Sequence, residues 1–209
     1  NRWNKALKKE GTPADITPQK EFYRQYIQNS KDRVVVIISD AMRHEVGKEL
    51  YDRLLSDEKC TPEMDIMIGN LPSYTRLGMA ALLPNKEITM TEDYKVLVDR
   101  MSCESLSQRE AILKKANLNS RCVQFDDIKH KTRDQLREVF TGMEVVYIYH
   151  NQIDARGDKA NTENEVFIAS YEAIDELYSF IKRISVSANT HHFIITSDHG
   201  FIYKRDKLE

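Results

Sequence analysis

The sequence predicts an α/β protein with three layers, in which helices cover both faces of a mostly parallel central sheet. Runs of β-branched residues alternate along the chain with segments of helical periodicity, as in successive strand and helix units. The run at 34–38 lacks polar alternation, which is typical of a strand buried on both faces. A chain of 209 residues with 41% hydrophobic content is long enough for one sizeable core.

The expected elements follow one another in a regular order. Residues 1–18 are rich in Lys and contain Thr-Pro pairs, so we expect a linker or the tail of a preceding region there, and one domain over 19–209. Strands are expected at 33–39, 64–69, 94–98, 121–125, 144–150 and 192–197. Helices are expected at 19–29, 43–56, 75–82, 105–116, 132–141 and 163–186.

The longest helix is predicted by its apolar spacing. Three- and four-residue steps place one set of apolar residues on a single helix face: Phe167, Tyr171, Ile174, Leu177 or Tyr178, Ile181 and Ile184. We expect this face to pack on the sheet.

The composition of the chain argues against several classes of protein. The net charge of −2 gives the chain no general affinity for nucleic acid, and we interpret its short basic stretches as solvated helix faces. Three cysteines, Cys60, Cys103 and Cys122, without C-x-x-C spacing argue against a disulfide framework or a zinc knuckle and favour a cytoplasmic setting. We expect no membrane span, because no apolar run has the required length, and no glycine-rich nucleotide loop.

Polar residues follow several of the predicted strands. Asp40 comes directly after the first strand, and Asp198 and His199 come after the last. A Pro-Ser-Tyr-Thr-Arg segment at 72–76 follows the second strand, and a segment with His150, Asp154 and Asp158 follows the fifth. The carboxyl ends of parallel strands meet at one edge, where carboxylates and imidazoles suit zinc or manganese.

Thr75 is the candidate nucleophile. It precedes a predicted helix, where it would sit at or beside the helix N-terminus. A bound metal ion would lower the pKa of its hydroxyl, although a threonine in this position is commonly an ordinary N-cap. Ser73 is an alternative nucleophile, and Arg76 could clamp phosphoryl oxygens in bidentate fashion. The joint pattern of four strand-end loops favours chemistry over chance.

The order of these motifs resembles the alkaline phosphatase superfamily of two-metal phosphotransfer enzymes. The stretch from Arg33 to Tyr203 more narrowly resembles the PglZ domain of bacterial BREX phage-defence proteins. Its most distinctive strings are Ser-Asp-Ala-Met-Arg at 39–43 and Tyr-His-Asn-Gln-Ile-Asp at 149–154. The resemblance implies an alkaline phosphatase-like fold. Such proteins are large, so we expect this chain to be a segment of a longer polypeptide.

The resemblance also implies roles for individual residues. Asp40, Thr75, Asp198 and His199 would surround one metal, with Thr75 attacking phosphorus and forming a phosphothreonine intermediate. Asp154 and Asp158 would hold a second divalent cation, zinc or manganese, with His150 as a substitute ligand or as a support for Asp154. Many members of the superfamily have His at the position of Asp158 and a further His downstream. We therefore expect the second site to be incomplete in this segment.

The function implied is that of a metal-dependent phosphatase or phosphodiesterase in a phage-defence complex. A rival interpretation is a catalytically silent domain that serves as a scaffold for the other proteins of that complex. Nucleic-acid contact is expected only through the full-length protein. A haloacid dehalogenase-type phosphatase is disfavoured, because it needs a second Asp where this chain has Met42.

Overall fold

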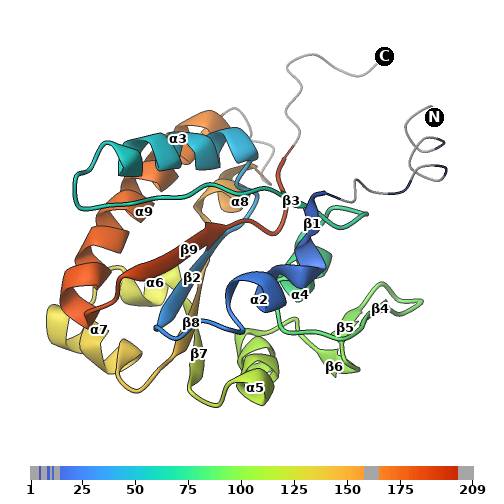
Figure 1. The fold of residues 1–209 in the computed structure, drawn as a ribbon. Helices are drawn as coiled ribbons and strands as arrows, with labels where there is room; N and C mark the ends of the chain where they lie inside the picture. The colour runs from blue at the N-terminus through green and yellow to red at the C-terminus, as the bar shows by residue number, and fades with distance from the viewer. Residues whose placement is uncertain (1–4, 6–8, 10, 12–14, 158–164, 202–209) are drawn as a thin grey trace.

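Four parallel strands form the central sheet (Figure 1). Their order is β7 (Ser120–Gln124), β8 (Val145–His150), β2 (Val34–Ser39) and β9 (His192–Thr196). The computed structural model describes residues 5, 9, 11, 15–157 and 165–201. Every residue of β2 and β8 is buried, as expected for central strands without polar alternation.

Helices cover both faces of this sheet, which confirms the predicted three-layer α/β class. Val35 and Ile37 of β2 face one apolar core, and Val34, Val36 and Ile38 face the other. The first core includes residues of α3 (His44–Leu55), α6 (Phe125–Ile128), α7 (Arg133–Phe140), α8 (Gln152–Gly157) and α9 (Val166–Ala188). The second includes residues of α2 (Phe22–Tyr26), α4 (Thr75–Ala81) and α5 (Leu106–Ala116).

The expected helices are all present, with small shifts in their ends. Helix 19–29 is shorter than predicted and consists of the 3-10 turn η1 (Gln19–Glu21) followed directly by α2. Both α5 and α7 begin with a complete capping box, at Ser105 and Thr132 respectively, which fixes where each helix starts. The short helices α6 and α8 were not predicted, because each is too brief to show a helical period.

Two predicted strands lie outside the main sheet. Strand 94–98 is β5 (Val96–Val98), the middle of an antiparallel sheet with β4 (Ile88–Met90) and β6 (Met101–Ser102). The turns that join these strands are too short for a parallel crossover, so the strands form hairpins instead. Strand 64–69 contracts to β3 (Met67–Ile68), which pairs with β1 (Thr17–Pro18).

The buried face of α9 differs from the prediction in its first half. Ile174, Leu177 and Ile184 are buried, but Phe167 and Tyr171 are 47% and 62% exposed. Small side chains replace them in the core, among them Ala169 and Ala173. The apolar spacing identified the helix correctly but placed the face of its first two turns wrongly, because Ala and Ser carry little signal in a hydrophobic pattern.

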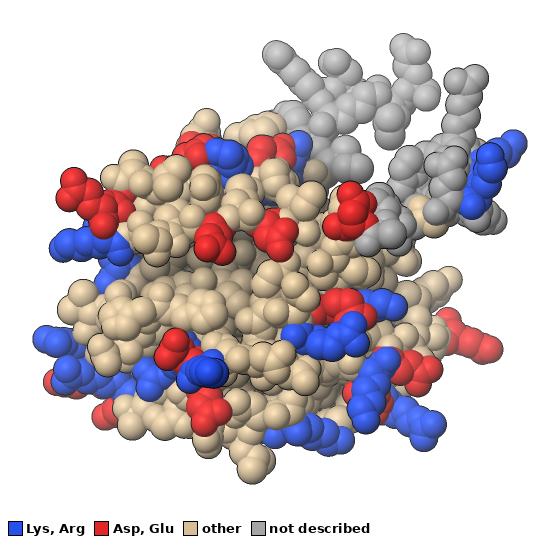
Figure 2. Space-filling model, viewed as in Figure 1, with Lys and Arg blue, Asp and Glu red and all other residues tan. Residues whose placement is uncertain are grey.

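The surface carries charges of both signs. Figure 2 shows Lys and Arg interspersed with Asp and Glu over the face in view, consistent with a net charge of −2. Among the helices of the described residues, none combines the length and the apolar character that a membrane crossing requires.

Candidate metal centre

The ends of two neighbouring strands bring three candidate ligands together. Asp40 follows β2, and Asp198 and His199 follow β9, which pairs directly with β2. Each of the three offers one ligand atom, and these atoms all lie within 4.8 Å of one another. The backbone turns at Ala41, with φ of 61°, and the Ala41 amide donates a hydrogen bond of 3.2 Å to Asp198 Oδ1. The parallel register of the two strands therefore builds the cluster.

Thr75 belongs to the same cluster. It is the first residue of α4, and its Oγ1 lies 3.0 Å from His199 Nε2. The N-cap of α4 is Tyr74, so the Thr75 hydroxyl is not a helix cap. It contacts the candidate ligand atom of His199 instead.

Gly78 allows α4 to pack this closely against the candidate metal ligands. A Cβ atom on this residue would lie 2.3 Å from the carbonyl oxygen of Asp198 and 2.9 Å from its Cβ. No side chain other than hydrogen fits that space. Gly78 stands one helical turn after Thr75, so the contact fixes the position of Thr75 relative to Asp198.

Gln19, which is distant in the sequence, also contacts the loop that carries Asp198. Its side chain is 3% exposed, and its Nε2 donates to the carbonyl oxygens of Ser197, at 3.0 Å, and Asp198, at 2.7 Å. This residue was not predicted from the sequence. A single Gln before a short helix carries no motif, and the contact depends on residues about 180 positions apart.

Two buried carboxylate oxygens in the cluster have no hydrogen-bond partner among the described residues. They are Asp40 Oδ1 and Asp198 Oδ2. His199 Nε2 lies 3.7 Å from the first and 3.4 Å from the second without forming a hydrogen bond to either. Buried acceptors are rarely left without a partner, and a charged one is costly. Two such oxygens beside an imidazole suit a divalent cation.

The pKa values of the two carboxyl groups respond to this crowding. Burial, followed by the negative charges of Asp198 and Asp154, raises the pKa of Asp40 to about 8. Burial also raises the pKa of Asp198. Two carboxyl groups in one buried volume resist ionising together, and a bound cation would remove that resistance.

Asp154 is the remaining candidate ligand that the structure describes. It lies half-buried on α8, after β8, and its charge acts on Asp40. The strand that precedes α8 is β8, which pairs with β2 on the side opposite to β9. Asp154 therefore approaches the same edge of the sheet as Asp40 and Asp198. Asp158, the expected partner of Asp154 in a second metal site, lies outside the described residues.

The other candidates from the sequence lie around this cluster. Ser73 is exposed, and the guanidinium of Arg76 pairs with Glu104 at 3.3 Å. His150 is 2% exposed and turned into the core, where its Nδ1 lies 3.0 Å from Ser39 Oγ and its Nε2 lies 3.2 Å from Glu176 Oε2. Both ring nitrogens of His150 thus already have protein partners.

Arg109 is a cation near the cluster that the sequence analysis did not identify. Its guanidinium carbon lies 4.7 Å from the centre of the Tyr149 ring, and its Nε donates to the Cys103 carbonyl at 2.8 Å. Its positive charge lowers the pKa of Asp40, against the larger effects that raise it. An Arg on the first turns of an amphipathic helix looks like a surface residue in the sequence.

The raised pKa of Asp40 predicts a pH dependence of stability in the metal-free protein. A carboxyl group whose pKa is higher in the folded state contributes stability that is complete below the unfolded pKa and is lost as the pH rises through the folded value. In chelator, the free energy of unfolding should therefore fall between about pH 4 and about pH 8. Asp40→Asn should flatten this fall, as measured by urea unfolding, and an unchanged slope would contradict the assignment.

The close contact at Gly78 predicts that Gly78→Ala destabilises the protein by about 1–3 kcal/mol, because backbone atoms must move to admit the methyl group. Gly47 is the matched control, since it also lies in a helix and a Cβ there meets only the flexible end of Met42 at 3.9 Å. Gly47→Ala should stabilise by about 0.4–1 kcal/mol. Urea unfolding measures both changes, and equal effects would disprove the packing argument.

Comparison with known proteins gives the family of this chain. The family described as the BREX system PglZ alkaline phosphatase-like domain matches residues 20–209. The chain is 43% identical over 215 residues to the alkaline phosphatase-like protein PglZ of Bacillus cereus strain H3081.97, covering all of this chain and 25% of the relative. It is 34% identical over 218 residues to the alkaline phosphatase-like protein BrxZ of Escherichia coli O9:H4 strain HS, covering 99% of this chain and 25% of the relative.

The chain thus spans a quarter of the length of these two curated relatives. The family model covers most of the chain, including Asp40, Thr75 and the strand-end pair Asp198 and His199. On this ground, the chain belongs to the PglZ family of BREX alkaline phosphatase-like domains.

Proposed function

We propose that this chain is a metal-dependent phosphohydrolase domain, a phosphatase or phosphodiesterase, that acts through Thr75. One observation carries the proposal. The Thr75 hydroxyl contacts His199 Nε2, and that nitrogen lies 3.7 Å and 3.4 Å from two buried carboxylate oxygens that lack hydrogen-bond partners among the described residues. A purely structural role gives no reason for that arrangement, because buried carboxylate oxygens are normally paired with donors.

Asp40, Asp198 and His199 would hold the first divalent cation, zinc or manganese. When bound, such an ion lowers the pKa of an adjacent hydroxyl and polarises a phosphoryl oxygen. Asp154 approaches the same edge and, with Asp158, would contribute to a second cation site. The four groups of the first site come from three separate segments, so the fold, and not one local motif, determines their spacing.

The reaction assigned to Thr75 is attack on phosphorus. Its oxygen, having released its proton to solvent, forms a bond to phosphorus as the bond to the leaving ester oxygen breaks. Water then hydrolyses the phosphothreonine, which restores the hydroxyl. Gly78 and Gln19 maintain the position of the Asp198 loop relative to Thr75 during these steps.

Positive charge for the phosphoryl oxygens would come from arginine. Arg109 is the better placed of the candidates, because its charge acts on Asp40 and its orientation is fixed by Tyr149 and the Cys103 carbonyl. Arg76 is paired with Glu104 on the exposed surface and would have to leave that pair to bind a phosphoryl oxygen.

In the BREX context of the family, we further propose that the domain works beside other proteins of a defence complex.

The catalytic assignment predicts a loss of hydrolysis in Thr75→Ala. We expect kcat for a bis-aryl phosphodiester or an aryl phosphate monoester, with added Zn²⁺ or Mn²⁺, to fall by at least about 100-fold, because the nucleophile is removed. Thr75→Ser should retain part of the activity. Ser73→Ala is the matched control and should leave kcat nearly unchanged, since Ser73 is exposed and two residues away.

Two results would contradict this assignment. Full activity in Thr75→Ala, with loss of activity in Ser73→Ala, would move the nucleophile to Ser73. Activity in neither the wild-type protein nor its variants, together with no binding of either metal, would favour the scaffold role.

A further inference from the structure

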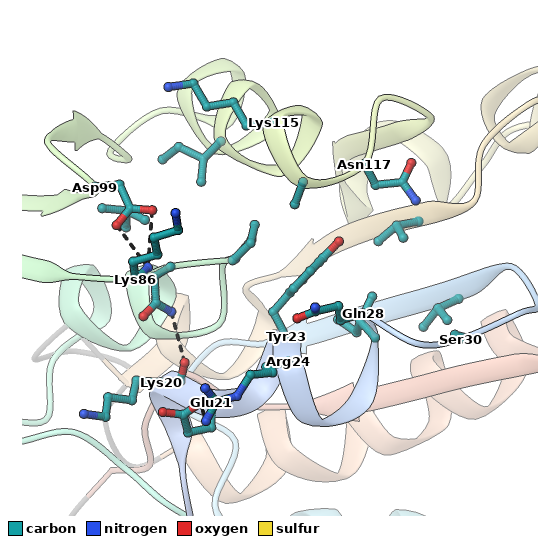
Figure 3. A pocket seen from close by; sticks show the side chains of 18 of the residues that line it. Lys20, Glu21, Tyr23, Arg24, Gln28, Ser30, Lys86, Asp99, Lys115 and Asn117 are labelled. Atoms are coloured by element: carbon teal, nitrogen blue, oxygen red, sulfur yellow. Dashed lines mark hydrogen bonds and ion pairs between the residues drawn. The ribbon is translucent and has the colours of Figure 1, made fainter.

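A large cavity lies at the opposite edge of the sheet from the metal cluster. Its volume is about 1280 Å³, and the central-sheet residues that line it, Val34 and Val145, are the first residues of β2 and β8. Its walls come from η1 and α2, from the segment 84–87, from the turn between β5 and β6 and from the end of α5 (Figure 3). We call it the amino-edge groove.

The amino-edge groove carries more unpaired positive charge than negative charge. Five of its cations make no side-chain hydrogen bond or ion pair with any described residue: Lys20, Lys31, Lys86, Arg100 and Lys115. They come from different walls, and Figure 3 shows Lys20, Lys86 and Lys115 placed around the hollow. This excess stands out in a chain whose net charge is −2.

Most acidic groups of the groove are already engaged. Glu21 pairs with Arg24 at 2.5 Å, and Glu144 accepts hydrogen bonds from Asn117 and Asn119. Asp99 accepts from the backbone amides of residues 86 and 87, at 3.0 Å and 2.8 Å. The acidic side chains that remain without such a partner are those of Asp32 and Glu87, so unpaired cations outnumber them.

Part of the groove lining is apolar and accessible. It comes from the half-buried Pro84 and Met101 and the exposed Ala116, while Ile27, Val98 and Ile112 are at most 4% exposed. Tyr23 is the single aromatic residue among those that line the groove, and it is 7% exposed. A site for single-stranded nucleic acid normally offers several exposed rings on which bases stack. The groove offers cations around aliphatic contacts instead.

The size of the groove points to an extended ligand. Pockets for small molecules commonly measure about 300–1,000 Å³, and this cavity exceeds that range. A peptide segment brings both carboxylates for the surrounding lysines and aliphatic side chains for the apolar part of the lining. Its affinity would come from apolar contact and its orientation from charge.

From the charge, the apolar lining and the volume together, we infer that the amino-edge groove docks an acidic peptide segment with interspersed aliphatic residues, supplied by a partner protein. The groove lies at the edge of the sheet remote from Thr75, so this inference does not depend on the proposed hydrolysis. Docking there would leave the metal cluster open to its own substrate.

The test uses a short fluorescein-labelled peptide of Glu-Glu-Leu repeats and fluorescence anisotropy with the protein. We expect binding that weakens when NaCl rises from about 0.05 M to about 0.3 M, because salt screens the attraction between the lysines and the peptide carboxylates. The double variant Lys86→Glu and Lys115→Glu should weaken binding by about tenfold or more. A peptide of Glu-Glu-Gly repeats should also bind more weakly, since it lacks aliphatic side chains.

The matched control is the double variant Lys59→Glu and Arg133→Glu. Both residues are exposed and outside the groove, and the change in net charge is the same. This variant should bind the Glu-Glu-Leu peptide as the wild-type protein does. Equal weakening in the two double variants, no binding of the peptide, or tighter binding of a single-stranded oligonucleotide of equal charge would each overturn the inference.

Discussion

The candidate site depends on two buried carboxyl groups that the fold brings into one small volume. Asp40 and Asp198 lie at the ends of adjacent parallel strands, and each has an oxygen without a hydrogen-bond partner among the described residues. Such a pair opposes folding unless something neutralises it, which the raised pKa values of both groups reflect. A bound divalent cation would relieve this repulsion, and the nearby imidazole and hydroxyl are placed to act as further ligands.

The rest of the structure keeps this pair in place. The strands β2 and β8 are buried on both faces, and their pairing fixes the position of Asp40 at the end of β2. The Gln19 side chain donates a hydrogen bond to the loop that carries Asp198. Gly78 allows the helix that carries Thr75 to pack against that loop. Each of these contacts is specific in geometry, and together they limit how far the four groups of the site can move apart.

The sequence predicted the parts that depend on local pattern. The alternation of apolar runs and helical segments gave the fold class, and the polar residues after 34–38 and 193–195 gave the cluster of Asp40, Asp198 and His199. Thr75 was found because it precedes a helix after a Pro-containing turn. Each of these motifs spans only a few consecutive residues, so it can be recognised without knowledge of the tertiary structure.

The parts that were missed depend on contacts between distant segments. Gln19, Gly78 and Arg109 acquire their roles only when η1, α4 and α5 meet the strand ends. Strand 94–98 was expected in the main sheet, but its short connections fold it into a separate hairpin sheet. In α9, Ala and Ser took the buried positions that the hydrophobic pattern assigned to Phe167 and Tyr171.

X-ray diffraction at the zinc absorption edge, from crystals of the protein grown with Zn²⁺, would show directly whether these groups bind a metal ion. We predict an anomalous peak at about 2.0–2.2 Å from a carboxylate oxygen of Asp40, one of Asp198 and a ring nitrogen of His199. A zinc-loaded protein with every anomalous peak elsewhere, and with the Asp40 and Asp198 oxygens still unliganded, would contradict it.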